Sequence, residues 1–511
     1  MTAPSVVPPV AETSAASAAA AAAAAAPRAA PSIAVPAPPP GIPLRVVPPL
    51  VSTALIMLGA GVLASLLPLR FSAMGLSPGV IGLIATAEAL GFLVGCLQAH
   101  RIIAPVGLER AYAAFAGMKA VAILSLYFAE GVPALAFFRF LIGLNAAGLA
   151  IIVESWLNAL VPNAQRGRVL TIYVLVYGLF YGAGQLVGQN LNVSGPEFLL
   201  IAGISTTLAL VPMVGINVRA PVLPHRVKLE ILKALRTSPA SVMACMLNGL
   251  ILTGFFTVGP LFGVKIGFDQ QHVVILMACV SLGGLVLQWP IGYFSDKVDR
   301  LHALIGLGLG VLAVAATLIT VDHRTPFAVI GILFAIFGGL AESLYAVGVA
   351  HANDRADKTD YVALSSTLLF VWALGAAIGP TTGTYAIQLI SPSAFFGYVV
   401  ALTLVFTAFA IWRLNRRKVE RLSEEREGFL TYPQTSPEIY AWLPYHREPP
   451  GSERAADGHV PDSPVPASHV PPSPAPASPA PASPVPASPV PASPVPASPL
   501  PASHIPGEAH D

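Results

Sequence analysis

Several ionisable side chains of this sequence lie inside long apolar segments, where they could bind a substrate or carry a proton. Arg139 and Glu342 are the two main candidates. A charged group within a membrane is costly and usually functional, so we expect both to contact substrate or take part in coupling. Burial should keep Glu342 protonated until water reaches it, which is the condition for carrying a proton. A helix-packing role is the alternative for each.

Three further charged residues have structural interpretations. Glu88 and Lys119 stand at positions that could face each other on neighbouring helices, and we expect a buried ion pair between them. Glu154 lies near the end of its segment and is followed by Arg166 and Arg168. We expect Glu154 to pair with one of these arginines, or with the adjacent loop, as part of an inner gate. Contact with a cavity is the alternative.

A short segment of both charge signs, G-Y-F-S-D-K-V-D-R at residues 292–300, separates two long apolar segments. This composition is typical of a cytoplasmic turn in a multi-span transporter. Gly292 would let a neighbouring backbone come close, and Asp296 could meet a helix N-terminus or a basic partner. Lys297 and Arg300 would hold the turn on the side where positive charge accumulates. The sequence therefore predicts an inner-gate loop here.

The overall composition indicates a membrane protein. Of 511 residues, 55% are hydrophobic and 11% are charged, whereas a typical soluble domain has about a quarter charged residues. A membrane-spanning helix needs roughly 20 mostly apolar residues. Twelve segments meet this requirement: 47–69, 79–99, 110–129, 133–157, 168–190, 198–217, 240–262, 272–294, 302–320, 327–350, 361–389 and 394–414. The expected fold class is an all-α membrane protein with twelve transmembrane helices.

Basic residues predict the orientation of these spans. With a cytoplasmic N-terminus, the inner loops hold thirteen Lys and Arg and the outer loops three, which is the bias that the positive-inside rule expects. A basic cluster from Arg413 to Arg421 follows the last span. We therefore expect both termini in the cytoplasm and an even number of spans.

Other kinds of chemistry are not indicated. The net charge of +2 mostly reflects the orientation signal, so no nucleic-acid partner is expected. Cys96, Cys245 and Cys279 fall within predicted spans, which suggests unpaired thiols with neither a disulfide nor a metal site. The sequence has no Walker loop, catalytic Ser-His constellation or metal-ligand spacing, so we expect neither an enzyme nor a cofactor.

Three segments of different composition flank and divide the spans. Residues 1–45 are rich in Ala and Pro, lack the features of a signal peptide, and are expected to form a disordered cytoplasmic tail. Residues 416–511 form a second tail with a P-V-P-A-S repeat that favours extended polyproline II. This tail could be a spacer, a docking segment or without a selected role. Residues 218–239 should form a cytoplasmic linker, in which the run V-K-L-E-I-L-K-A-L-R could be an amphipathic helix on the inner leaflet.

The two sets of six spans look related to each other. The sequence E-S-W-L begins at Glu154 and E-S-L-Y begins at Glu342, and Arg166 and Arg355 follow at comparable distances. Paired glycines in the fifth and eleventh spans agree with the same offset of about 190 residues. A parallel repeat of six spans predicts a substrate path between two halves. Arg166 and Arg355 become corresponding inner-gate candidates.

These motifs resemble those of the major facilitator superfamily (MFS). Residues 292–300 are similar to the family's loop signature G-x-x-x-D-[RK]-x-[GD]-[RK], which joins its eighth and ninth spans. Leu135, Arg139 and Gly143 look like its second signature, with the intramembrane arginine. The sequences E-S-W and A-N-D-R are similar to those of the bacterial YcaD-type subgroup. The resemblance covers about residues 45–415.

The resemblance implies the fold of this superfamily, with two six-helix bundles at 46–217 and 240–415. In such proteins the first, fourth, seventh and tenth helices line the central path. Asn145, Asn248, Thr253 and Tyr345 lie on three of these helices and are therefore cavity candidates.

Two departures from the family pattern limit what it implies. After the second span, Gly95 is followed by Ala99, His100 and Arg101 where D-R or D-K is usual, so the inner lock of the N-terminal half should be weaker or differently built. The fifth span lacks the G-P pair of the antiporter signature, so antiport is not indicated.

The chain is thus interpreted as a multi-pass secondary transporter of the inner (cytoplasmic) membrane. We expect it to move a small-molecule substrate by alternating access, coupled to protons, as a monomer in contact with membrane lipid. An uncoupled facilitator is one alternative. The other is a non-transporting receptor or scaffold that uses its Pro-rich tail.

Overall fold

The structure is a computed structural model that describes residues 44–161, 165–214, 229–322, 324–356 and 361–416. Nearly all of both predicted tails and the first part of the predicted linker lie outside these ranges. The regular elements of the described residues are helices. The prediction of an all-α membrane protein is therefore confirmed.

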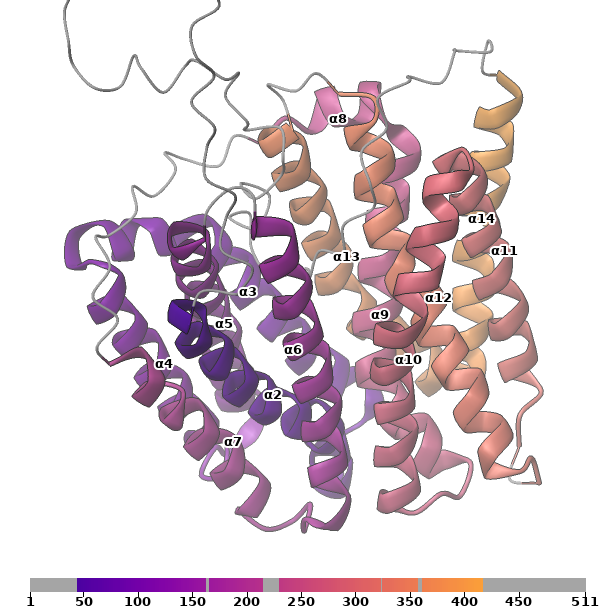
Figure 1. The fold of residues 1–511 in the computed structure, drawn as a ribbon. Helices are drawn as coiled ribbons and strands as arrows, with labels where there is room; N and C mark the ends of the chain where they lie inside the picture. The colour runs from indigo at the N-terminus through magenta and orange to yellow at the C-terminus, as the bar shows by residue number, and fades with distance from the viewer. Residues whose placement is uncertain (1–43, 162–164, 215–228, 323, 357–360, 417–511) are drawn as a thin grey trace, which may run out of the picture. The chain divides into compact units, whose positions relative to one another are not determined.

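Twelve helices of 12 to 30 residues and one helix of 7 residues make up the described part of the chain (Figure 1). The first six of the twelve are α2 (Val47–Ala73), α3 (Pro78–Val106), α4 (Leu108–Ser125), α5 (Gly131–Leu160), α6 (Arg166–Val187) and α7 (Glu197–Leu208). The short helix is α8 (Ile231–Thr237), and the last six are α9 (Pro239–Lys265), α10 (Gln270–Lys297), α11 (Arg300–Ile319), α12 (Phe327–Asn353), α13 (Tyr361–Leu389) and α14 (Ala394–Arg416). Three 3₁₀ turns, η1 (Leu44–Val46), η3 (Gly188–Asn190) and η4 (Val211–Met213), extend or follow helices.

Ten of the described helices are long and apolar enough to cross a membrane. The two predicted spans that do not reach this threshold correspond to α4 and α7. Helix α4 carries Glu109, Arg110 and Lys119 within 18 residues, and α7 is only 12 residues long. An apolar stretch continues past α7 to Met213. Twelve spans are therefore consistent with the structure.

The segment at residues 292–300 is mostly helical, which corrects the predicted loop. Helix α10 continues to Lys297, and α11 begins at Arg300, so only Val298 and Asp299 lie between them. The Lys297 ammonium lies 4.1 Å from the centre of the Tyr293 ring one turn earlier, which favours this extension. Asp296 pairs with Arg300 across the break between α10 and α11. Asp299 then caps α11 by accepting a hydrogen bond from the Leu301 N–H.

Residues 231–236 of the predicted amphipathic run lie in α8, which is a short helix, while its first two residues, 227 and 228, lie outside the described ranges. Leu232 is 61% exposed while Ala234 is buried. The Glu230 backbone N–H, just before α8, donates a hydrogen bond to the Thr367 hydroxyl of α13 (3.0 Å). We call the end of the helices that carries α8 the α8 end, and the opposite end the far end.

The two sets of six helices pack by the same pattern. Helices α2 and α6 pair in the first set as α9 and α13 do in the second, and α3 and α5 pair as α10 and α12 do. Likewise α4 contacts α7, and α11 contacts α14. Between the sets, α3 packs against α13, α6 against α10, and α2 against α9. The site described below lies along these last contacts.

Two corresponding glycines show why α2 and α6, and likewise α9 and α13, pack so closely. A Cβ atom on Gly184 of α6 would overlap the Leu58 carbonyl oxygen of α2. A Cβ on Gly379 of α13 would overlap the Leu250 carbonyl oxygen of α9 in the same way. Glycine at these positions lets the helix backbones come into contact. Such close van der Waals packing drives helix association in a membrane, because the lipid is as apolar as the helices and supplies no hydrophobic force.

We predict that Gly184→Ala will destabilise the protein because the added methyl group forces α6 away from α2. The expected loss is about 1–3 kcal/mol, as for overpacking of a tight core. Gly306→Ala is the matched control, since a Cβ at Gly306 in α11 meets nothing within 4 Å. Thermal unfolding in detergent should show a lower transition for Gly184→Ala only. Equal transitions for both variants would contradict the packing argument.

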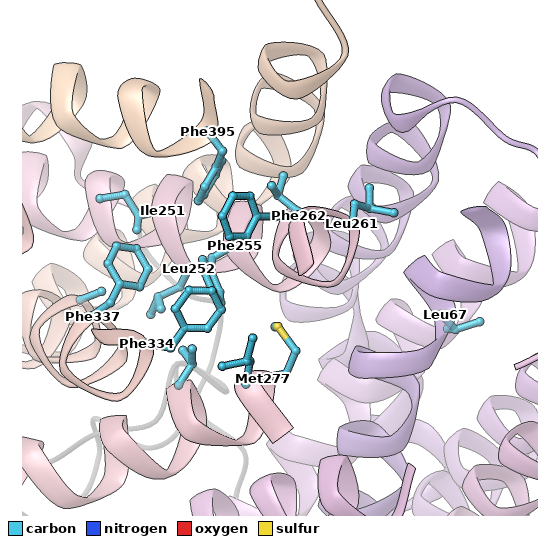
Figure 2. Packing of buried hydrophobic residues seen from close by; sticks show 14 of the residues in the cluster. Leu67, Ile251, Leu252, Phe255, Leu261, Phe262, Met277, Phe334, Phe337 and Phe395 are labelled. Atoms are coloured by element: carbon cyan, nitrogen blue, oxygen red, sulfur yellow. The ribbon is translucent and has the colours of Figure 1, made fainter. Parts of the chain in front are cut away.

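A cluster of aromatic rings forms the core of the second set and orients α9 (Figure 2). The Phe255 ring lies 5.2 Å from the Phe334 ring and 5.1 Å from the Phe337 ring of α12. Because Phe255 points into this core, its neighbours Thr253 and Phe256 line a cavity instead. Core packing thus decides which side chains of α9 are available for function.

Candidate functional site: a cavity between the two helix sets

A cavity of about 290 Å³ lies between the two sets of helices. Its walls come from α2, α3, α4, α5, α6 and α7 on one side and from α9 and α13 on the other. Three charged side chains line it, Glu88, Lys119 and Arg139, and all belong to the first set. Most of the remaining wall is apolar or aromatic, as in typical small-molecule sites.

A second cavity of about 200 Å³ adjoins the first. Glu342 of α12 and Gln288 of α10 line only this second cavity. Five residues border both cavities: Tyr177, Tyr181, Thr253, Phe256 and Trp372. The two cavities therefore share an aromatic wall, with the basic groups in one and the Glu342 carboxyl in the other.

Glu88 forms its ion pair with Arg139, not with Lys119 as the sequence suggested. The reason is the close packing of α3 on α5. A Cβ atom on Gly143 of α5 would overlap the Glu88 carbonyl oxygen, and one on Gly91 of α3 would overlap the Phe140 carbonyl oxygen. This contact brings the side chains of Glu88 and Arg139 together, and Arg139 is only 13% exposed.

Lys119 of α4 lies in the same cavity but has a different environment. It is 4% exposed. The Glu88 carboxylate acts on Lys119 electrostatically but makes its ion pair with Arg139. Because Glu88 is shared with Arg139, the three charges leave one net positive charge at this site, and this charge favours an anion in the space beside Lys119.

Glu342 packs against α10 at a position where only glycine fits comfortably. A Cβ atom on Gly284 would lie 2.9 Å from the Glu342 Cγ. Gly284 therefore leaves the space that the Glu342 side chain occupies on the wall of the second cavity. Figure 1 shows α10 and α12 side by side in the second set.

Of the other predicted cavity residues, Thr253 lines both cavities, whereas Asn248, Tyr345 and Asn145 line neither of them. The Asn248 amide donates to the Ala341 carbonyl oxygen (2.6 Å) and accepts from the Trp372 indole N–H (2.8 Å), so it ties α9 to α12 and α13. Tyr345 is fully buried, with its ring 6.3 Å from that of Trp372. Asn145 donates to the Leu141 carbonyl oxygen of its own helix (2.6 Å). These three residues support or adjoin the walls.

Several inner-gate candidates gather at the α8 end of the second set. Arg300 is 4% exposed at its side chain and donates to Asp296 (3.1 Å), to Asp354 (2.8 Å) and to the Ala350 carbonyl oxygen (2.8 Å). This network joins the end of α10 to the end of α12. Asp354 was not among the gate candidates, although the A-N-D-R sequence that contains it and Arg355 was the available signal.

The remaining gate candidates are spread more widely. Gly292 is buried in α10, and Arg166 begins α6. Arg355 lines a small cavity next to α8 together with Glu230 and Lys233. Glu154 is fully buried and accepts a hydrogen bond from the Tyr173 hydroxyl of α6 (3.0 Å).

Hydrogen bonds between the two sets cluster toward the far end. The Gln388 side chain accepts from the Gly79 N–H (2.7 Å), and the Thr86 hydroxyl donates to the Ala377 carbonyl oxygen (2.6 Å). Gln270 donates to the Leu191 carbonyl oxygen (2.5 Å). These bonds close the start of α3 on the end of α13, and the start of α10 on the end of α6.

The aromatic wall was not predicted from the sequence. Tyr177 and Tyr181 stand four residues apart, the spacing of one helix face, and this was the available signal for them. Phe256 and Trp372 gave no such signal, because aromatic residues are common in apolar segments. The rings of Tyr181 and Phe256 meet at 5.7 Å, which joins the two sets across the cavity.

Comparisons with known proteins agree with this architecture. A family model for the Major Facilitator Superfamily matches residues 50–339 and 272–486. An uncharacterized MFS-type transporter, YcaD, of Salmonella typhimurium is 26% identical over 358 residues, covering 69% of this chain and 91% of the relative. An uncharacterized MFS-type transporter of Yersinia pestis is 28% identical over 368 residues, with the same coverage of 69% and 91%.

Solved structures show the same fold at low sequence identity. The nucleoside transporter NupG is similar with a TM-score of 0.58 and 13% identity, covering 74% of this chain and 100% of that chain. A bacterial homolog of the human lysosomal transporter Spinster gives a TM-score of 0.58 and 15% identity, covering 74% and 98%. With the family match over more than half of its length, the chain belongs to the major facilitator superfamily and is a multi-pass membrane transporter.

Proposed function

We propose that this protein is a proton-coupled secondary transporter that moves a small solute across the inner membrane by alternating access. The observation that carries the proposal is the pair of adjoining cavities, lined by both helix sets and bordered by the Glu342 carboxyl. In this proposal the bundles 46–217 and 240–415 rock against each other around the cavities, as in other transporters built from repeats. The protein works as a monomer, with both termini in the cytoplasm.

The hydrogen bonds between the sets support an assignment of states. If the α8 end is cytoplasmic, the bonds of Gly79, Thr86 and Gln270 close the outer side of the path. Opening to the outside then requires these bonds to break and contacts at the α8 end to form. The bonds of Arg300 to Asp296, Asp354 and Ala350 keep the ends of α10 and α12 together as the bundle moves.

Reconstituted vesicles test the coupling. Purified protein in liposomes, with a pH-sensitive dye inside, is exposed to a panel of metabolites and drugs with and without an imposed pH gradient. A coupled transporter moves protons only when its solute is present, and it accumulates that solute when the gradient is imposed. If the solute only equilibrates across the membrane, whether or not a pH gradient is imposed, the protein is an uncoupled facilitator. No movement of any solute by folded protein favours the receptor or scaffold, and deletion of 422–511 then tests the tail.

We predict that Asp296→Asn will slow turnover about tenfold with little change in substrate affinity. The variant weakens one charge-assisted hydrogen bond of Arg300, worth roughly 1.5 kcal/mol, and a tenfold change in rate corresponds to about 1.4 kcal/mol. Glu109→Gln is the control, since it also replaces a carboxylate by an amide, at an exposed position at the start of α4. Transport rate and equilibrium binding should be measured on the same preparations. A large loss of binding by folded Asp296→Asn would identify Asp296 as a substrate ligand instead.

A further inference from the structure

The charges of the larger cavity favour an anionic ligand. Glu88, Lys119 and Arg139 are the charged residues that line it within the described chain. Glu88 and Arg139 neutralise each other in their ion pair. Lys119 then remains as one positive charge, 4% exposed, beside an apolar space. An acidic group in this space would balance this charge and accept a hydrogen bond from the ammonium.

The rest of the wall favours a flat apolar body. Phe92 and Trp372 meet edge to face at 6.3 Å, and Tyr181 and Phe256 meet edge to face at 5.7 Å. Each pair joins a helix of the first set to a helix of the second. Aromatic side chains bind planar rings by stacking or edge contacts. A ring bound here would touch both sets at once.

We propose that the cavity takes a small organic anion with an aromatic ring, whose carboxylate binds Lys119 and whose ring lies among Tyr181, Phe256 and Trp372. This proposal rests on the transport function above and adds the class of substrate. The carboxylate of the ligand lies near Lys119, because the second cavity is bordered by the Glu342 carboxyl, which disfavours another acidic group. A cavity of about 290 Å³ suits an acid of one or two rings.

Binding to purified protein, without a membrane gradient, tests the proposal. The probes are 2-naphthoate, its neutral amide 2-naphthamide, 2-naphthylmethylammonium, and octanoate as an anion without a ring. Isothermal titration calorimetry should show 2-naphthoate binding at least tenfold more tightly than each of the other three. Equal or tighter binding of the amide, the ammonium or octanoate would overturn the proposal. Failure of 2-naphthoate to bind folded protein at millimolar concentration would also overturn it.

Variants at Lys119 test whether its positive charge is what binds the carboxylate of the ligand. Lys119→Gln should weaken 2-naphthoate binding about tenfold and leave 2-naphthamide binding unchanged, while Lys119→Arg should retain most of the affinity for the anion. Lys265→Gln is the matched control, because Lys265 lies at the exposed far end of α9. Size-exclusion chromatography excludes misfolded variants. Undiminished 2-naphthoate binding by folded Lys119→Gln would show that the ligand carboxylate does not bind Lys119.

The result is separable from the test of the transport function. Selective binding of 2-naphthoate with no proton movement would contradict the coupling and leave the ligand class standing. Proton-coupled transport of a cationic or uncharged solute, with no preference for 2-naphthoate, would contradict the ligand class and leave the coupling standing.

Discussion

Replacing Glu342 by Gln is expected to abolish accumulation of solute driven by a pH gradient while preserving exchange of solute across the membrane. Glu342 borders the second cavity on α12, where ionising a carboxylate is costly. The neutral amide resembles the protonated acid, so the bundles can still move, but no proton is released. One pH unit supports about tenfold accumulation per coupled proton, and the variant should reach no more than equal concentrations inside and outside.

Both activities should be measured on the same vesicles, with counterflow of labelled solute as the exchange assay. Glu109→Gln is the matched control, since Glu109 is an exposed carboxylate at the start of α4. Its accumulation should equal that of the unchanged protein. Undiminished pH-driven accumulation in Glu342→Gln would mean that Glu342 only packs against Gly284. Loss of exchange together with accumulation would indicate a role in binding or folding instead of coupling.

The second large effect is expected at the Glu88–Arg139 ion pair. Glu88→Gln leaves the Arg139 guanidinium, 13% exposed, without its carboxylate partner. Breaking a fully buried pair typically costs about 3–5 kcal/mol. Because Glu88 is 32% exposed to the cavity, we expect a smaller loss of about 2 kcal/mol in stability. Transport should also fall, since both side chains line the larger cavity.

A double-mutant cycle separates this interaction from general damage. Glu88→Gln and Arg139→Gln should each lower the thermal transition in detergent, and the double variant should be more stable than the sum of the two losses predicts. Lys119→Gln provides a reference for removing a cation from the same cavity. Strictly additive losses in the cycle would show that the two residues stabilise the protein independently, and would contradict the pairing.

Helices α3 and α5 illustrate what sequence reasoning could reach and where it stopped. Apolar length predicted both helices, and the rarity of intramembrane charge marked Glu88 and Arg139 as important. The pairing itself depended on the rotation of each helix about its axis, which Gly91 and Gly143 decide through close backbone contact. Lys119 therefore appeared to be the partner of Glu88 in the sequence, although α3 presents Glu88 to Arg139 in the structure.

The sequence by itself determined the all-α membrane fold, the approximate helix limits and the membership of the superfamily. These follow from apolar length and from local motifs, which depend on nearby residues only. Tertiary structure decided which side chains of each helix face the cavity. Tyr345 and Asn248, chosen from their helices, lie behind Trp372, while Tyr181 and Phe256 form the wall. The side of a helix that faces the cavity depends on contacts between residues far apart in the chain. An apolar helix can bury any of its sides, so only its packing against neighbouring helices decides which side lines the cavity.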